Sequence, residues 1–103
     1  MIKSKIQKLL ASDRIVLFIK GEKNCPVCGF SANVINILKK LKFDFISINV
    51  LKNEQIRRGI KEFSNWPTIP QLYVDRKFIG GNDIVVEMYR NGDLLSLLKN
   101  KIK

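Results

Sequence analysis

A run of five consecutive apolar residues, Ile15–Ile19, places the strongest constraint on how this chain can fold. The run is rich in β-branched residues and does not alternate with polar ones, which is typical of a strand covered on both faces. An amphipathic stripe follows at Phe30, Val34, Ile37, Leu38 and Leu41, and it predicts a helix whose stripe, Phe30 included, packs in the core. A second strand is predicted over Phe43–Val50. Strand, helix and strand in this order form a right-handed parallel crossover.

The rest of the chain predicts further helices and a β-hairpin. A short amphipathic helix is expected over Ser4–Ala11, and Asn53 is placed to cap a helix that ends near Ser64-Asn65. After a breaker-rich loop over residues 66–70, the hairpin is expected as Gln71–Val74 and Lys77–Gly80 about the turn Asp75-Arg76.

Two more helices complete the expected order. The first begins at Asn82 or Asp83 with Gly92 past its end, and the second carries Leu94–Leu98 and a basic end made of Lys99, Lys101 and Lys103. The order of elements predicts an α/β fold in which a four-stranded mixed sheet is flanked by helices, the thioredoxin-like arrangement.

Both cysteines of the chain, Cys25 and Cys28, lie between the first predicted strand and the helix after it. The stretch can be a Cys-x-x-Cys redox pair, or Cys28 alone can open the helix. A thiolate at a helix N-terminus faces unpaired N–H groups, which can lower a cysteine pKa from ~8.5 to about 3.5–7.5. Cys28 has this position if the helix starts at Gly29 or Phe30. The residues alone leave both registers open.

Length and composition limit the class of protein. The 103 residues fit one domain over 1–103, and no apolar stretch approaches the ~20 residues that cross a bilayer, so no membrane is expected. Two cysteines are too few to staple a secreted scaffold, which favours a reducing compartment, a bacterial cytoplasm or an organelle matrix. The net charge of +10 suits an anionic partner, but the lysines are spread along the chain. No nucleic-acid partner is therefore expected.

Three motifs occur in the order and spacing of one known family. They are Cys28-Gly29-Phe30-Ser31, the segment Asn65–Gln71 with the sequence Asn-Trp-Pro-Thr-Ile-Pro-Gln, and Gly80-Gly81-Asn82-Asp83 before a helix. With these residues the chain resembles the monothiol glutaredoxins of the Cys-Gly-Phe-Ser type from Lys20 to Leu98. The resemblance implies a thioredoxin-like fold, glutathione as ligand, and transfer of a 2Fe–2S cluster in iron–sulfur protein biogenesis and iron homeostasis. Thiol–disulfide reductase activity is expected to be weak.

The resemblance also favours one register of the cysteines. Monothiol members have an extended loop between the strand-end lysine and the active cysteine, and Lys20 precedes Cys28 by eight residues. Dithiol members have that lysine three residues before their nucleophile, whereas Lys20 lies five before Cys25. The monothiol register fits better, and Cys25 in the loop is the departure from the family pattern. Because Cys25 is a second thiol near Cys28, residual thiol–disulfide exchange activity remains an open alternative.

The resemblance implies a glutathione site with a charged group at each end. Lys20, Arg57 and Lys61 match positions that approach the glycine carboxylate. Thr68-Ile69-Pro70 is the family's cis-proline loop, in which Ile69 N–H and C=O pair with the ligand backbone. The N–H groups of Gly81, Asn82 and Asp83 would hold the γ-glutamyl carboxylate, while the Asp83 side chain receives the amino group. Many relatives have Cys or Ser where Asn82 stands, and Trp66 is interpreted mainly as packing.

The ligand count of the implied cluster predicts an oligomer. A 2Fe–2S cluster normally takes four thiolates, and the chain has two cysteines and no histidine. Cys28 from each of two subunits and two glutathiones would give a cluster-bridged homodimer, while the same count argues against a structural zinc site. A BolA-type protein and apo iron–sulfur acceptor proteins are the further partners implied. The alternative is an oxidoreductase in which Cys28 attacks a mixed disulfide and Cys25 or glutathione resolves it.

Overall fold

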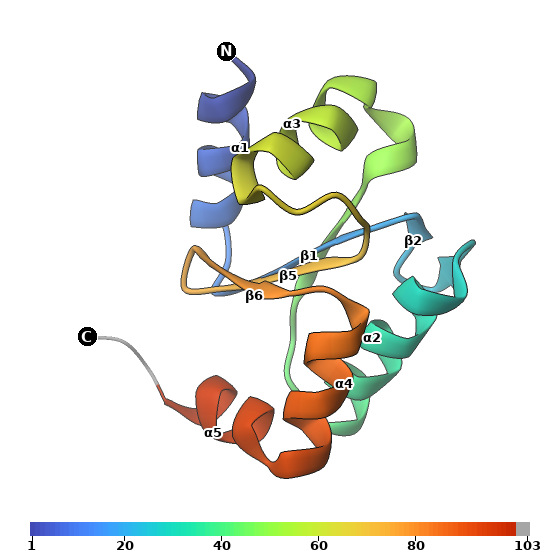
Figure 1. The fold of residues 1–103 in the computed structure, drawn as a ribbon, viewed down its shortest axis with the longest axis vertical. Coiled ribbons are helices and arrows are strands. Elements are labelled where there is room, and N and C mark those ends of the chain that lie inside the picture. Colours follow the sequence, from blue (N-terminus) through green and yellow to red (C-terminus); the bar gives the residue numbers. More distant parts are fainter. Residues whose placement is uncertain (101–103) are drawn as a thin grey trace.

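The computed structural model describes residues 1–100, which form a four-stranded mixed sheet between two layers of helices (Figure 1). The elements in chain order are α1 (Ile2–Ala11), β1 (Ile15–Ile19), β2 (Gly21–Glu22), β3 (Cys25–Pro26), α2 (Gly29–Lys40), β4 (Ile46–Asn49), a 3-10 helix η1 (Val50–Lys52), α3 (Glu54–Ser64), β5 (Gln71–Val74), β6 (Lys77–Gly80), α4 (Asn82–Asn91) and α5 (Asp93–Lys99). The strand order is β4-β1-β5-β6, with β1 parallel to β4 and antiparallel to β5. The predicted thioredoxin-like arrangement is confirmed. No helix within residues 1–100 is long and apolar enough to span a bilayer.

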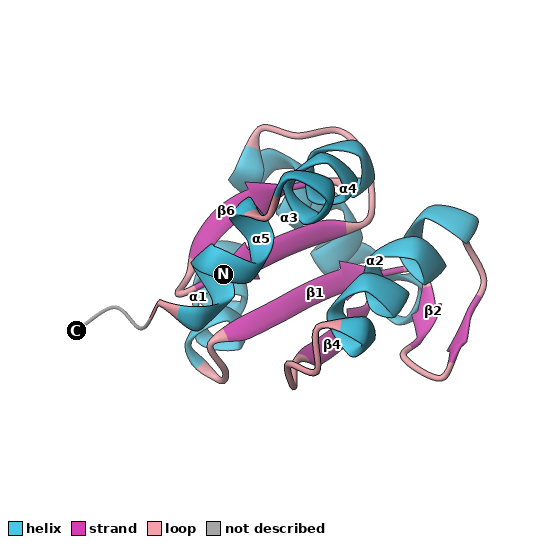
Figure 2. Cartoon of the chain, turned by 90° about the horizontal axis from the view of Figure 1, so that it is seen from below, coloured by secondary structure: helices cyan, strands magenta, loops and turns pink. Residues whose placement is uncertain are grey.

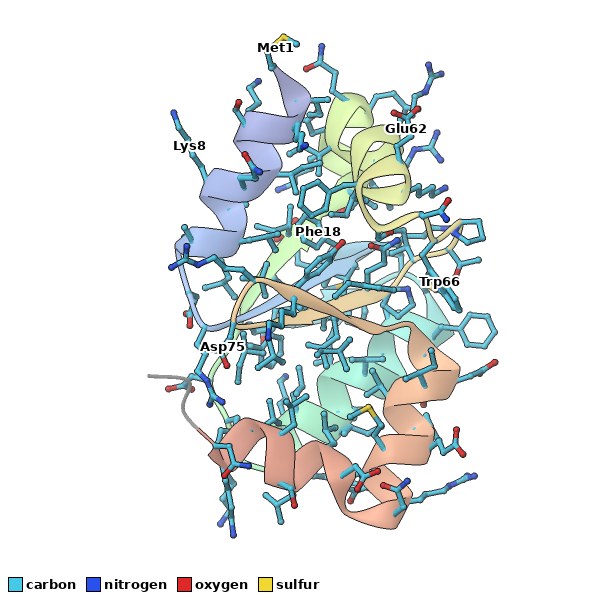
Figure 3. All side chains as sticks on the ribbon, turned by 60° about the vertical axis from the view of Figure 1, so that its left-hand side comes forward. Met1, Lys8, Phe18, Glu62, Trp66 and Asp75 are labelled. Carbon is cyan, nitrogen blue, oxygen red and sulfur yellow. The ribbon has the colours of Figure 1, made fainter. Side chains whose placement is uncertain are left out.

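Strand β1 lies at the centre of two apolar cores, one on each face of the sheet. Helices α1 and α3 cover one face, and α2, α4 and α5 cover the other (Figure 1). Ile15, Leu17 and Ile19 of β1 belong to the core beneath α2, whereas Val16 and Phe18 belong to the core beneath α1 and α3. All five are buried, which confirms the prediction from the apolar run. In Figure 3, Phe18 lies in the interior while Met1 and Lys8 project outward.

The segment between β1 and α2 is more ordered than predicted. In place of the extended loop expected between Lys20 and Cys28, β2 pairs antiparallel with β3, and Cys25 lies opposite Glu22. The ribbon is anchored because Asn49 Oδ1 accepts a hydrogen bond from Gly21 N–H at 3.0 Å, and Asn49 Nδ2 donates to Glu22 at 2.8 Å. Figure 2 shows this ribbon beyond the end of β1, beside α2. The loop prediction was wrong because these anchors come from β4, far along the chain.

The predicted helix ends and turn are largely confirmed, and the second strand is shorter than expected. Asn53 Oδ1 caps α3 by accepting from Ile56 N–H at 3.1 Å. Asp75 and Arg76 both have positive φ, 51° and 66°, as a tight two-residue hairpin turn requires. The strand predicted over Phe43–Val50 covers only Ile46–Asn49, and at its C-terminal end Asn49 caps η1, to which Val50 belongs. The predicted basic residues Lys101 and Lys103 lie outside the described residues.

The C-terminal end of α5 is held by an arginine from the loop before β1. Arg14 Nη2 donates to Leu97 C=O at 3.1 Å, and its guanidinium also donates to the carbonyls of Leu98 and Asn100. Arg14 Nε lies 3.2 Å from both carboxylate oxygens of Asp75. The last carbonyls of a helix have no partner within the helix, so a cation here satisfies them.

Candidate functional site

A cavity of about 470 Å³ opens where β1 ends and helices α2 and α4 begin. The predicted site residues that line it are Lys20, Cys28, Lys61, Thr68, Ile69, Pro70, Gly81, Asn82 and Asp83. The structure therefore brings residues from five separate stretches of the chain to one place.

Arg57 is the predicted site residue that does not line this cavity. Its guanidinium forms a bidentate ion pair with Glu54, one turn earlier in α3, with Nε–Oε2 at 2.9 Å and Nη2–Oε1 at 2.6 Å. The hydrogen bond from Arg57 is the main reason why the pKa of Glu54 falls to about 2. Any contact between Arg57 and a ligand competes with this local ion pair.

Cys28 is the N-cap residue of α2, because the helix begins at Gly29. Burial by itself raises the pKa of the thiol. Hydrogen bonds from the backbone N–H groups of Ser31 and Phe30 and from the Ser31 hydroxyl outweigh burial, with the Lys20 charge adding to them, so the pKa lies below its ordinary value. Cys28 therefore has the position at a helix start that was expected if the helix began at Gly29 or Phe30. Cys25 is an exposed free thiol on β3.

Ser31 links the cysteine to the end of β1. Its side chain is fully buried, and its Oγ accepts a hydrogen bond from Lys20 N–H at 3.2 Å. Because the Ser31 hydroxyl also favours the Cys28 thiolate, the fourth residue of the Cys-Gly-Phe-Ser motif fixes the start of α2 against the sheet.

We expect alkylation of Cys28 by iodoacetamide to reach half its maximal rate at a lower pH than an ordinary thiol, whose pKa is ~8.5. The thiolate is the reacting form, so a lowered pKa increases the reactive fraction at any pH below the ordinary value. The measurement is a pH–rate profile in a Cys25→Ser background. Ser31→Ala should move the midpoint upward, and a wild-type midpoint at or above that of a free thiol would contradict the assignment.

The prediction that Phe30 packs in the core is wrong. It is 60% exposed and lines the cavity beside Cys28, and Val27 is 66% exposed on the other side of the cysteine in sequence. The helical stripe is buried at Val34, but the first turn of α2 lies by the β2–β3 ribbon, past the end of the sheet (Figure 2). Two exposed apolar side chains therefore flank the cysteine in sequence.

The wall opposite Cys28 is a cis-proline loop. The Ile69–Pro70 peptide is cis, as the resemblance implies, and the Ile69 side chain is buried. Within residues 1–100, no hydrogen bond involves the N–H or the C=O of Ile69. Both groups are therefore available to an extended ligand.

Trp66, Pro67 and Ile84 also line the cavity, and reasoning from the sequence did not place them in the site. Trp66 does pack, with its ring centroid 5.8 Å from that of Phe78, but its buried Nε1 has no hydrogen-bond partner in the part of the chain that the structure describes. Their positions next to the predicted ligand-binding residues were the available signal.

The third wall is the N-terminus of α4. Gly81 caps the helix without a side-chain hydrogen bond, so the first N–H groups of α4 have no acceptor from the cap. A Cβ on Gly81 would lie 3.0 Å from Trp66 Nε1 and 3.4 Å from Pro70 C=O, so a side chain there would press on the cis-proline wall. Asn82 Nδ2 donates to Asp83 Oδ1 at 3.2 Å.

The cavity thus offers charged groups of both signs to a zwitterionic ligand. Lys20 and Lys61 supply cations, and within residues 1–100 neither forms a salt bridge. The α4 N-terminus supplies N–H groups together with the Asp83 carboxylate. In the same described part, no cluster of three or more His, Cys, Asp or Glu side chains could hold a metal ion.

Comparison with known proteins agrees with this geometry. The family model for glutaredoxin matches residues 15–79. The chain is 48% identical over 97 residues to an uncharacterized monothiol glutaredoxin, ycf64-like, of Synechocystis, which covers 94% of this chain and 91% of that protein. The chain belongs to the monothiol glutaredoxin family.

Solved glutaredoxins share the fold. Reduced apo GrxS14 of poplar has a TM-score of 0.85 and 49% sequence identity, covering 95% of this chain and 90% of that chain. A buckwheat glutaredoxin solved as a complex with glutathione has a TM-score of 0.82 and 26% identity, covering 95% and 90%.

Proposed function

We propose that this monothiol glutaredoxin binds glutathione in the cavity beside Cys28 and carries a 2Fe–2S cluster to apo iron–sulfur proteins. The observation that carries the proposal is a single thiol with a lowered pKa in the lining of a cavity that also contains two lysines, an aspartate and the N-terminus of α4, which suit a peptide with charged termini. The glutathione complex of the buckwheat glutaredoxin supports the choice of ligand. A reducing compartment, a bacterial cytoplasm or an organelle matrix, would keep both thiols free.

Each part of glutathione has a matching group in the cavity. Its glycine carboxylate would lie near Lys20 and Lys61, and its backbone would pair with the free N–H and C=O of Ile69. Its γ-glutamyl carboxylate would accept from the N–H groups of Gly81–Asp83, because a helix N-terminus favours an anion. The Asp83 carboxylate would accept from the ligand's ammonium group.

The donor set fits the cluster as cargo shared between two chains. A 2Fe–2S cluster requires four ligands, and among residues 1–100 Cys28 is the only thiol that lines the cavity. Cys28 from each of two subunits, together with the thiolates of two glutathiones, would complete the set. The exposed apolar side chains of Val27 and Phe30 around Cys28 would then be covered in the dimer. A BolA-type protein would bind in place of the second subunit.

Anaerobic reconstitution with iron, sulfide and glutathione tests this proposal. We expect visible absorbance of a 2Fe–2S cluster, an elution volume that shifts from monomer to dimer, and no absorbance when glutathione is omitted. A coloured monomer, or colour without glutathione, would remove the proposed ligand set.

A second candidate function is a glutathione-dependent thiol–disulfide oxidoreductase. The exposed free thiol of Cys25, three residues before Cys28, favours it. In that reaction the Cys28 thiolate attacks the glutathione sulfur of a mixed disulfide, which releases the substrate thiol and leaves glutathione bonded to Cys28. Cys25 then displaces that glutathione by forming a Cys25–Cys28 disulfide, or a second glutathione regenerates the Cys28 thiolate and leaves as oxidised glutathione. Turnover that depends on Cys25 would favour this function over cluster transfer.

We expect Lys20→Glu and Asp83→Ala each to weaken glutathione binding by about tenfold or more, since each removes a charge-assisted contact. Isothermal titration calorimetry measures the affinity. Lys8→Glu and Asp44→Ala are matched controls, because both residues are exposed and do not line the cavity. The melting temperature of all four variants should stay near that of the wild type. Unchanged affinity in both Lys20→Glu and Asp83→Ala would exclude these residues from the site.

A further inference from the structure

Gln71 is a fully buried polar side chain at the start of β5, with 0% of its surface exposed. Both hydrogen-bonding ends of its carboxamide are used. Its Nε2 donates to Trp66 C=O at 3.0 Å and to Thr68 C=O at 3.2 Å, and its Oε1 accepts from Tyr73 O–H at 3.2 Å. A buried amide costs free energy unless it is paired in this way.

The partners of Gln71 show what the pairing does. Both acceptors are backbone carbonyls of the cis-proline loop, one on each side of Pro67. With these carbonyls held toward the interior, the next residue, Ile69, has an N–H and a C=O that no group within residues 1–100 engages. Gln71 could have paired its carboxamide with any nearby polar groups, but its Nε2 instead connects two carbonyls of this loop.

Tyr73 fixes which way the carboxamide points. Its ring is buried among Phe18, Phe63 and Phe78, with centroids 5.5, 6.3 and 5.4 Å away. Burial raises the pKa of Tyr73 to about 12, so the hydroxyl stays protonated and donates. Because the hydroxyl donates to Oε1, the two N–H groups of Nε2 must face the loop.

We propose that Gln71, oriented by Tyr73, is a positioning residue that holds the cis-proline loop in its glutathione-binding shape before the ligand arrives. This inference rests on the proposed binding of glutathione. The hydrogen bonds of Gln71 to the loop and to Tyr73, here called the brace, exist before the ligand binds. The ligand therefore meets Ile69 in an ordered loop, and binding loses less conformational entropy. Gln71 itself does not line the cavity and acts only through the loop.

The test compares Gln71→Met, which has similar volume and no hydrogen bonds, with Val74→Ala. Val74 is also buried in β5 but faces the other core, so its truncation destabilises the fold without touching the loop. At a temperature where both variants are folded, we expect Gln71→Met to weaken glutathione binding about tenfold, and Val74→Ala to stay within roughly twofold of the wild type. Tyr73→Phe should weaken binding in the same direction by a smaller factor, and it serves if Gln71→Met does not fold. Wild-type affinity in the brace variants, or an equal loss in Val74→Ala, would overturn the proposal.

A second readout needs no ligand. Trp66 is the only tryptophan of the chain, and its carbonyl is one of the two that Gln71 holds. We expect acrylamide to quench its fluorescence more strongly in Gln71→Met than in the wild type, with no change in Val74→Ala. If the wild type does not bind glutathione, the proposed function is wrong, but the quenching experiment still tests whether Gln71 holds the loop. Identical quenching in all three proteins would then overturn it.

Discussion

Replacing Cys28 by serine is expected to abolish the visible absorbance that the wild-type protein gains on reconstitution, whereas Cys25→Ser should keep it. Iron–sulfur clusters are ligated by thiolates. Only Cys28 lies at a helix start, where hydrogen bonds from N–H groups and the Lys20 charge favour the ionised sulfur. Serine retains the shape of the side chain but is not ionised at neutral pH. Absorbance spectra of the three proteins, prepared in parallel, provide the measurement.

The same pair of variants separates the two candidate functions. Turnover of a small mixed disulfide with glutathione should be weak in the wild type and absent in Cys28→Ser. The dimer formed on reconstitution should also disappear in Cys28→Ser and persist in Cys25→Ser. Loss of the cluster in Cys25→Ser, with retention in Cys28→Ser, would show that the register is wrong. Robust turnover that Cys25→Ser abolishes would favour the oxidoreductase.

Phe18→Ala is expected to lower the free energy of unfolding by about 3–5 kcal/mol. Phe18 is fully buried in the central strand, and its ring packs edge-on against Tyr73 at 5.5 Å. Truncation loses the transfer free energy of the ring and leaves a cavity between β1 and the helices α1 and α3. Since small domains have only about 5–15 kcal/mol of stability, this is a large fraction of the total. Urea denaturation followed by circular dichroism measures it.

Phe30→Ala is the matched control for this prediction. Phe30 is 60% exposed, so its truncation removes little buried surface and should change the free energy of unfolding by less than roughly 0.5 kcal/mol. Comparable losses in the two variants would mean that Phe30 is packed in the core, as its place in the helical stripe of the sequence first indicated.

The fold was predictable where the sequence pattern of a segment agrees with the burial and hydrogen bonds that the segment has in the structure. The apolar run Ile15–Ile19 became a strand buried on both faces, and Asn53 capped α3 as its position indicated. The β2–β3 ribbon was not predictable, because hydrogen bonds from Asn49, more than twenty residues later, anchor it. The prediction that Phe30 is buried was wrong for a similar reason. Periodicity identifies the face of a helix but not where the sheet beneath it ends.

Most of the candidate site was predictable because its residues lie in short motifs. The resemblance to monothiol glutaredoxins located Cys28, the cis-proline loop and the α4 N-terminus. It also indicated Arg57, which the structure pairs with Glu54 at i−3, the partner that helix geometry favours. Gln71 closes one of these motifs, but nothing in the sequence indicated its role, because a glutamine in a strand is more often a surface residue than a buried support.

The contacts of Arg14 bear on how the chain folds during its synthesis. Strand β1 is made early, yet its antiparallel neighbour ends at Val74, and Arg14 finds its carbonyl acceptors only in residues 97–100. A nascent chain that still lacks residues 71–74 has a central strand with one open edge, and a chain that lacks residues 97–100 has a guanidinium without these carbonyl acceptors. Folding therefore reaches completion after translation has passed residue 100, whereas the edge of β1 is exposed, and open to chaperones, until β5 has been made.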